Sequence, residues 1–114
     1  LPWYGCSFAC VDRDPVGGGA YNGCPHVAPQ LLGGPTYADI VASYLPNATG
    51  GVVLNETTVT KVVNYRNSTG DVNQLWFDDP DTLSAKYAAV VKAGVRAVGT
   101  WTADSAGSNA TVAA

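Results

Sequence analysis

WFDDPDTLSAK (residues 76–86), followed after a short interval by VRAVGTW (residues 95–101), decides the fold of this chain. In the first stretch Asp79 is placed to cap a helix, since its side chain can accept a hydrogen bond from the first helical turn. Pro80 suits the first helical position, where its missing N–H costs nothing. Alanines and an apolar stripe then continue, and Gly94 suits a left-handed residue at a helix end. The pattern predicts a helix near residues 80–93.

Residues 95–101 predict a buried strand. The run is mostly apolar and lacks the alternation of a strand that has one face in water. This favours a strand covered on both faces, as in a parallel sheet. A helix, a short turn and a buried strand make half of a βαβ unit, so this part of the chain is predicted to be α/β.

The rest of the chain divides into short segments with different signals. We expect a strand end at 1–5, a loop-rich insertion at 6–35, a short helix at 36–45, a short strand at 52–54, and two hairpin strands at 58–66 and 71–77. The helix is predicted because Thr36 can cap it and Asp39 follows three residues later. The hairpin is predicted from β-branched and aromatic runs joined by a four-residue loop.

Composition excludes several classes of function. The chain has 114 residues and a formal net charge of -3, with 46% hydrophobic and 13% charged residues. One domain of ordinary size is expected. The sequence has no cluster of Lys or Arg, which argues against a nucleic-acid or anionic-membrane partner. No apolar run approaches the ~18 residues that a spanning helix requires. We expect no cofactor.

Four N-x-Ser/Thr sequons predict passage through the secretory pathway, with glycosylation at Asn47, Asn55, Asn67 and Asn109. The alternative is a cytosolic chain rich in Asn and Thr. Three cysteines also fit an oxidising compartment, with one pair and one thiol left over. The lone His26 is interpreted as a loop residue, because no nearby residues complete a triad and a zinc site would be poorly spaced.

Several motifs, in this order and spacing, resemble glycoside hydrolase family 18, the chitinase-like barrel enzymes. LPWYG at residues 1–5 resembles the end of barrel strand seven, FDDP at 77–80 with Ser84 and Lys86 resembles the segment before strand eight, and GTW at 99–101 resembles the end of strand eight. NYR at 64–66 and QLW at 74–76 place the resemblance closest to the chitobiase subgroup, over nearly the whole chain to about residue 104.

The resemblance implies a C-terminal fragment of a (β/α)8 barrel, from the end of strand seven to strand eight. Its domain would cover residues 1–104, with a small α+β insertion at about 6–75 that carries a hairpin and a flexible tail at 105–114. A complete barrel needs about 250 residues, so the chain is expected to be a piece of a larger molecule. Cys10 and Cys24 are predicted to be disulfide-bonded and Cys6 to be the odd thiol, with Cys6 the main competitor for either partner.

The resemblance also implies a function: hydrolysis of β-1,4-linked N-acetylglucosamine in chitobiose or chito-oligosaccharides. Trp101 would be the main substrate-binding residue, with a cis Trp101–Thr102 peptide, and Tyr4 a weaker candidate. Expected partners are a chito-oligosaccharide or N-glycan core and the remaining N-terminal barrel polypeptide or other chains of an assembly. The expected location is extracellular, or the lumen of a lysosome or vacuole.

No catalytic residue is assigned. The family's acidic signature, Asp-x-x-Asp-x-Asp-x-Glu, is absent, and the only glutamate, Glu56, lies inside a sequon on an expected surface loop. Asp78, Asp79 and Asp81 are better explained by helix capping than by paired catalytic carboxylates. Two alternatives to an enzyme fragment stay open on the same fold: a lectin-like glycan-binding protein and a structural extracellular glycoprotein.

Overall fold

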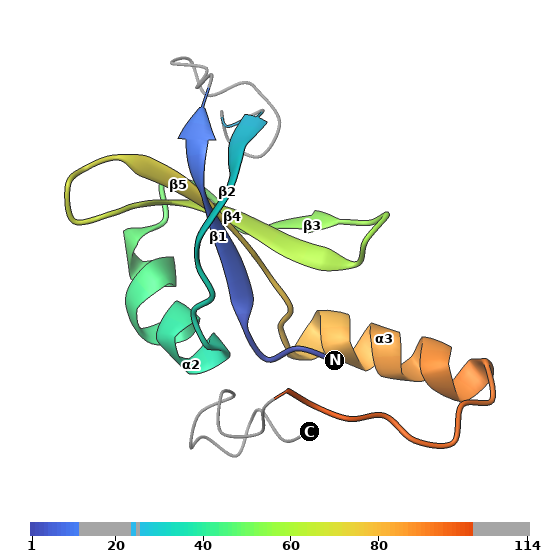
Figure 1. Cartoon of the computed structure of the whole chain (residues 1–114). Helices are drawn as coiled ribbons and strands as arrows, with labels where there is room; N and C mark the ends of the chain where they lie inside the picture. The colour runs from blue at the N-terminus through green and yellow to red at the C-terminus, as the bar shows by residue number, and fades with distance from the viewer. Residues whose placement is uncertain (12–23, 25, 102–114) are drawn as a thin grey trace.

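The structure is a computed structural model, and it describes residues 1–11, 24 and 26–101. An antiparallel sheet forms its centre, with one helical segment against the sheet and a longer helix extending from the end of it (Figure 1). The elements are β1 (Gly5–Val11), β2 (His26–Gly33), α2 (Tyr37–Asp39), the π-helical turn η1 (Ile40–Tyr44), the 3₁₀ turn η2 (Leu45–Asn47), β3 (Val53–Asn55), β4 (Thr60–Arg66), β5 (Val72–Phe77) and α3 (Pro80–Lys92).

The five-stranded sheet has the order β2-β1-β5-β4-β3. The predicted hairpin is confirmed as β4 and β5, which pair antiparallel from Lys61 opposite Phe77 to Arg66 opposite Val72. The expected short strand near 52–54 is β3, at the edge next to β4. All the strand pairs of this sheet are antiparallel, so the parallel arrangement expected of a barrel is not its main feature.

The expectation of a loop-rich segment over residues 6–35 was wrong. Most of the described part of it forms β1 and β2, which pair with each other, while β1 also pairs with β5. β1 is rich in Gly, Cys, Ser and Ala, which pack less side-chain surface on a pleated sheet than β-branched residues do. Its position is set by pairing with β5, more than 60 residues later in the chain, and a local pattern carries no signal for that contact.

The core lies between the sheet and the helical segment α2–η1–η2. It contains Ile40, Val63, Tyr65, Leu75 and Phe77, each 7% exposed or less. Gly5 is required by this packing: a Cβ there would lie 2.9 Å from Leu75 Cδ1 and 3.0 Å from the Trp76 carbonyl oxygen. The helical segment therefore lies directly against β1, β4 and β5.

The helix predicted over 36–45 lies in that place but is irregular. Thr36 caps it by accepting a hydrogen bond from the Asp39 amide at 3.2 Å. The amide of Leu45 donates to the Ile40 carbonyl, five residues earlier, which makes the middle turn π-helical. Pro46 follows and has no N–H to donate, so the segment ends in a short 3₁₀ turn.

The predicted caps of α3 are confirmed. Asp79 Oδ1 accepts a hydrogen bond from the Thr82 amide at 2.9 Å, and Thr82 Oγ1 accepts one from the Asp79 amide at 3.0 Å, which completes a capping box. Pro80 occupies the first turn, and Gly94 follows the helix with φ of 78°. Along the predicted apolar stripe only Leu83 is buried, and Val91 is 76% exposed.

The buried strand expected at 95–101 was wrong. Residues 95–101 are exposed and form one isolated parallel bridge, between Trp101 and Pro2. The reason is that no described strand covers this segment, which is held mainly by backbone hydrogen bonds to the start of the chain. The Leu1 ammonium donates to the Gly99 carbonyl at 2.6 Å, and the Trp101 amide donates to the Leu1 carbonyl at 3.0 Å. Residues 1–5 and 95–101, which were expected to be neighbouring barrel strands, thus lie parallel. However, residues 95–101 are not buried on both faces as expected.

Cys10 and Cys24 form a disulfide with Cα atoms 5.8 Å apart, and Cys6 is a free thiol. A buried polar network fixes Cys24 to the sheet. Gln74 Nε2 donates to the Cys24 carbonyl at 3.2 Å and to Asn64 Oδ1 at 3.1 Å. The disulfide therefore lies against the face of the sheet opposite the core, because Gln74 and Leu75 point to opposite faces of β5.

We expect Asp79→Ala to lower the free energy of unfolding by about 1–2 kcal/mol, because it removes the helix cap. It also removes the ion pair between Asp79 Oδ2 and Lys61 Nζ at 3.1 Å. Ser84→Ala is the control, since Ser84 is exposed on the same helix. Urea denaturation measures both, and equal stabilities of the two variants would contradict the role of the cap.

Candidate functional site

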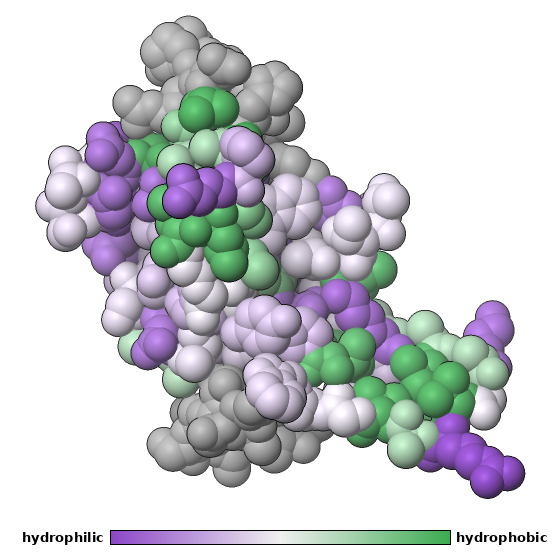
Figure 2. All heavy atoms as spheres, viewed as in Figure 1, coloured by the Kyte–Doolittle hydropathy of each residue, from purple (hydrophilic) through white to green (hydrophobic). Residues whose placement is uncertain are grey.

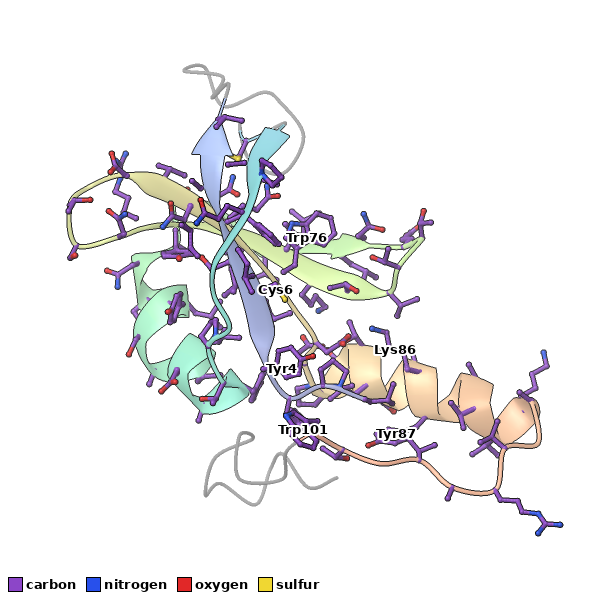
Figure 3. The ribbon with its side chains drawn as sticks, in the orientation of Figure 1. Tyr4, Cys6, Trp76, Lys86, Tyr87 and Trp101 are labelled. Carbon is purple, nitrogen blue, oxygen red and sulfur yellow. A yellow bond between two sulfur atoms is a disulfide. The ribbon has the colours of Figure 1, made fainter. Side chains whose placement is uncertain are left out.

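The two predicted substrate-binding residues lie at the end of the sheet where β1 begins (Figure 3). Trp101 is 72% exposed and Tyr4 is 40% exposed. Trp101 is the bridge partner of Pro2, and Tyr4 follows Pro2 by two residues. The structure thus brings the beginning and the end of the described chain together around two accessible aromatic side chains.

Backbone contacts hold these aromatic residues in place. The Trp3 amide donates to the Trp101 carbonyl at 2.8 Å, and the Tyr37 amide donates to the Trp3 carbonyl at 2.9 Å. Tyr4 bridges to Thr36 in an antiparallel pair. On the other side, the hydroxyls of Tyr87 and Thr100 are 2.9 Å apart, which connects the final segment to α3. Among the described residues, the hydrogen bonds of Trp101 come from its backbone, and its side chain is largely exposed.

Trp3 and Trp76 have different environments. Trp3 is 8% exposed and packs edge-on against Tyr37 with ring centroids 5.3 Å apart, so it is a core residue. Trp76 is partly exposed and lies opposite Cys6 on β1. Its indole N–H donates to Gln74 Oε1 at 2.9 Å, which fixes the ring on the sheet. Tyr4, Cys6 and Trp76 follow one another along the sheet (Figure 3).

Sequence reasoning identified Trp101 and Tyr4 but did not predict that Cys6 and Trp76 are neighbours. Their contact follows from the register of β1 against β5. The strand alternation from Tyr4 to Cys6 would place both on one face, but β1 itself was not predicted.

The acidic residues have structural roles. Asp78 is 5% exposed and accepts hydrogen bonds from Lys86 Nζ at 2.6 Å and Thr82 Oγ1 at 2.8 Å. Asp79 caps α3, as described. Glu56 lies exposed in the turn between β3 and β4. Asp78 and Asp79 already have partners, which supports the capping interpretation over paired catalytic acids.

Tyr37 is held in its neutral form. Burial raises the pKa of Tyr37, and the negative charges of Asp79 and Asp81 raise it further. A tyrosine is already protonated at neutral pH, and the raised pKa makes the phenol beside Trp3 still less suited to act as a base. Among the residues that the structure describes, no group of three or more His, Cys, Asp or Glu side chains could hold a metal ion.

Apolar side chains gather on α3 and the segment that follows it (Figure 2). Val91 is 76% exposed, Val95 56% and Val98 38%. Water-exposed valines on one helix and the adjoining segment are typical of a surface that another part of a protein covers. No described helix is both long enough and apolar enough to cross a membrane.

Three of the predicted glycosylation sites lie at the end of a strand or helical turn, or directly after one. Asn47 ends η2, Asn55 ends β3, and Asn67 follows β4. Asn109 lies outside the described residues, as do the tail at 105–114 and the Trp101–Thr102 peptide bond that was expected to be cis.

The chain matches no protein-family model. It is 28% identical to di-N-acetylchitobiase of Rattus norvegicus over 109 residues, which are 91% of this chain and 29% of that protein. The di-N-acetylchitobiase of Homo sapiens is 20% identical over the same share of this chain and 28% of its own length. This chain resembles the di-N-acetylchitobiases. The resemblance to family 18 that the motifs predicted is confirmed.

Solved structures of chitinase-like proteins share the fold of this chitobiase-like chain. The Bacillus cereus spore cortex-lytic enzyme SleL has a TM-score of 0.63 at 14% identity, over 89% of this chain and 21% of its own. A chitinase from Rhizomucor miehei has a TM-score of 0.61 at 18% identity, over 92% of this chain and 33% of its own. The chain thus spans less than a third of the chitobiases and about a third or less of these structures.

Proposed function

We propose that this chain is the C-terminal part of a glycoside hydrolase that acts on β-1,4-linked N-acetylglucosamine. The observation that carries the proposal is the position of Trp101, 72% exposed at the junction of the two chain ends, in a chain similar to chitobiase over 91% of its length. An indole face offers a flat apolar platform for the C–H face of a sugar ring. Tyr4 adds a second aromatic group at the same end of the sheet.

The chain supplies binding surface rather than the reacting acid. Glycoside hydrolysis requires a general acid next to the leaving oxygen. Glu56 is exposed in the turn between β3 and β4, and Asp78 is committed to Lys86 and Thr82. The acid therefore belongs to polypeptide outside this sequence, and the aromatic residues here would form one side of the sugar site.

The exposed valines of α3 and residues 95–98 form the surface for that polypeptide. The relatives are more than three times as long as this chain, since it spans 29% of the rat chitobiase. Covering Val91, Val95 and Val98 with apolar side chains would give the final segment the buried setting that its composition predicts. We place the assembled protein in the secretory pathway, outside the cell or in the lumen of a lysosome or vacuole.

The test is an assay of the full-length protein with chitobiose and longer chito-oligosaccharides. Release of N-acetylglucosamine supports the proposal. Binding without turnover would instead assign a lectin-like role, and neither binding nor turnover would assign a structural role.

The isolated 114-residue chain is expected not to hydrolyse chito-oligosaccharides. A missing general acid alone lowers the rate by about 10²–10⁴-fold, before any loss of substrate positioning. The measurement is release of N-acetylglucosamine from a chitobiose derivative, with the full-length protein as the positive control. Turnover by the purified chain above the buffer rate would contradict the assignment of the acid to another part of the polypeptide.

A further inference from the structure

A hollow of about 310 Å³ lies between the η1–η2 turns and the start of the β4–β5 turn. Two sequon asparagines, Asn47 and Asn67, line it together with Tyr44, Tyr65 and Arg66. Its size is at the lower end of the roughly 300–1,000 Å³ of small-molecule sites, which suits a single sugar ring. Nothing in the proposed hydrolase function uses this hollow.

The amide of Asn67 has a fixed orientation. Its Oδ1 accepts hydrogen bonds from the Thr69 amide at 3.0 Å, the Thr69 hydroxyl at 2.7 Å and the Asp71 amide at 2.9 Å. Because backbone N–H groups only donate, the atom that they contact is the carbonyl oxygen, and Nδ2 points away from the turn. Among the described residues, no hydrogen bond occupies Nδ2 of Asn67. In contrast, Nδ2 of Asn47 donates to the Ser43 carbonyl at 2.8 Å.

The hollow offers an aromatic wall beside Asn67. Tyr65 lies near the end of β4, two positions before Asn67, and both residues line the hollow. Tyr44 packs edge-on against Tyr65 with ring centroids 4.9 Å apart. Tyr65 is 7% exposed, whereas Tyr44 is only half-buried and presents the accessible ring.

We propose that Asn67 carries an N-linked glycan and that its first N-acetylglucosamine packs in this hollow against Tyr44. In the transfer, Asn67 Nδ2 attacks C1 of a lipid-diphosphate-linked oligosaccharide. The C1–N bond forms, the C1–O bond to the diphosphate breaks, the lipid diphosphate leaves, and the nitrogen loses one proton to a base of the transferase. The sugar would be attached to the free Nδ2 of Asn67, and the ring of Tyr44 would offer it a flat apolar surface.

A packed sugar would add a contact between the β4–β5 turn and the η1–η2 turns, beside the Tyr44–Tyr65 ring contact and the bridge between Ala48 and Tyr65. Removing the glycan is therefore expected to lower the Tm by about 2–4 °C. Thermal unfolding of the full-length protein, secreted from eukaryotic cells, measures this before and after treatment with a peptide N-glycosidase. Peptide mapping after the treatment detects the asparagine-to-aspartate conversion at each sequon.

Two variants test whether the glycan-dependent Tm shift depends on the hollow lined by Tyr44. Tyr44→Leu keeps an apolar side chain against the core but removes the flat ring, and it is expected to reduce the glycan-dependent Tm shift by at least half. Leu32→Ala is the matched control, because Leu32 lines a second hollow of about 450 Å³ that Asn67 also borders. Leu32→Ala should leave the shift unchanged.

The proposal fails if Asn67 is unmodified while Asn47 or Asn55 is occupied. It also fails if deglycosylation leaves the Tm unchanged, or if Leu32→Ala and not Tyr44→Leu removes the shift. Thr69→Ala should abolish the modification at Asn67, whereas Ser68→Ala, at the neutral middle position of the sequon, should preserve it.

Discussion

Replacing Leu75 by alanine is expected to lower the free energy of unfolding by about 2–5 kcal/mol, among the largest effects of any single substitution in this chain. Leu75 is completely buried in the central strand of the sheet. Its Cδ1 atom lies where a side chain on residue 5 would stand, since it is 2.9 Å from the ideal Cβ position of Gly5. Gly5 has no side chain to fill the cavity that the alanine leaves.

Chemical denaturation of the protein and of Leu54→Ala provides the comparison. Leu54 is 45% exposed at the sheet edge, so its truncation should change stability by less than about 0.5 kcal/mol. A similar small effect at Leu75 would mean that the sheet and the helical segment are not packed as described.

Replacing Trp101 by alanine in the full-length protein is expected to weaken binding of a chito-oligosaccharide by about 30- to 100-fold. The loss would come from the flat apolar surface, because the backbone hydrogen bonds of Trp101 to Leu1 and Trp3 do not depend on its side chain. Folding should therefore be preserved, which circular dichroism can verify.

Trp101→Phe is the matched variant, since it keeps an aromatic platform and should retain most of the affinity. Calorimetric titration with a short chito-oligosaccharide measures all three proteins. Equal affinities of the wild-type and alanine proteins would remove Trp101 from the sugar site and with it the observation that carries the proposed function.

The features that sequence predicted correctly have local causes. The capping box of α3 involves Asp79 and Thr82, three residues apart, and Gly94 closes the same helix. The β4–β5 hairpin is formed by neighbouring runs, and its turn is stabilised by Asn67, Thr69 and Asp71 within five positions. Each of these signals lies within one short window of the chain.

The features that sequence missed depend on distant parts of the chain. β1 pairs with β5 although its own residues have weak strand preference, and the contact of Cys6 with Trp76 follows only from that register. Residues 95–101 have the composition of a buried strand, but composition does not say which polypeptide would bury them. The proposed sugar site rests on motif resemblance, rather than local propensity, because only the resemblance indicated Trp101.

The pairing of Gly5 with Phe77 between β1 and β5 means that the segment between these two residues could be exchanged as a unit. The chain enters the five-stranded sheet at Gly5 and leaves it at Phe77, so both crossings lie one strand spacing apart, about 5 Å. Everything between these two residues could be shortened, enlarged or exchanged while the distance between the flanking segments stays the same. A tight turn joining residues 5 and 77 would keep Leu1–Trp3, α3 and Trp101 on one continuous chain. The sheet would thus be an exchangeable insertion, and the junction of Leu1–Trp3 with Trp101 would be the part that is kept.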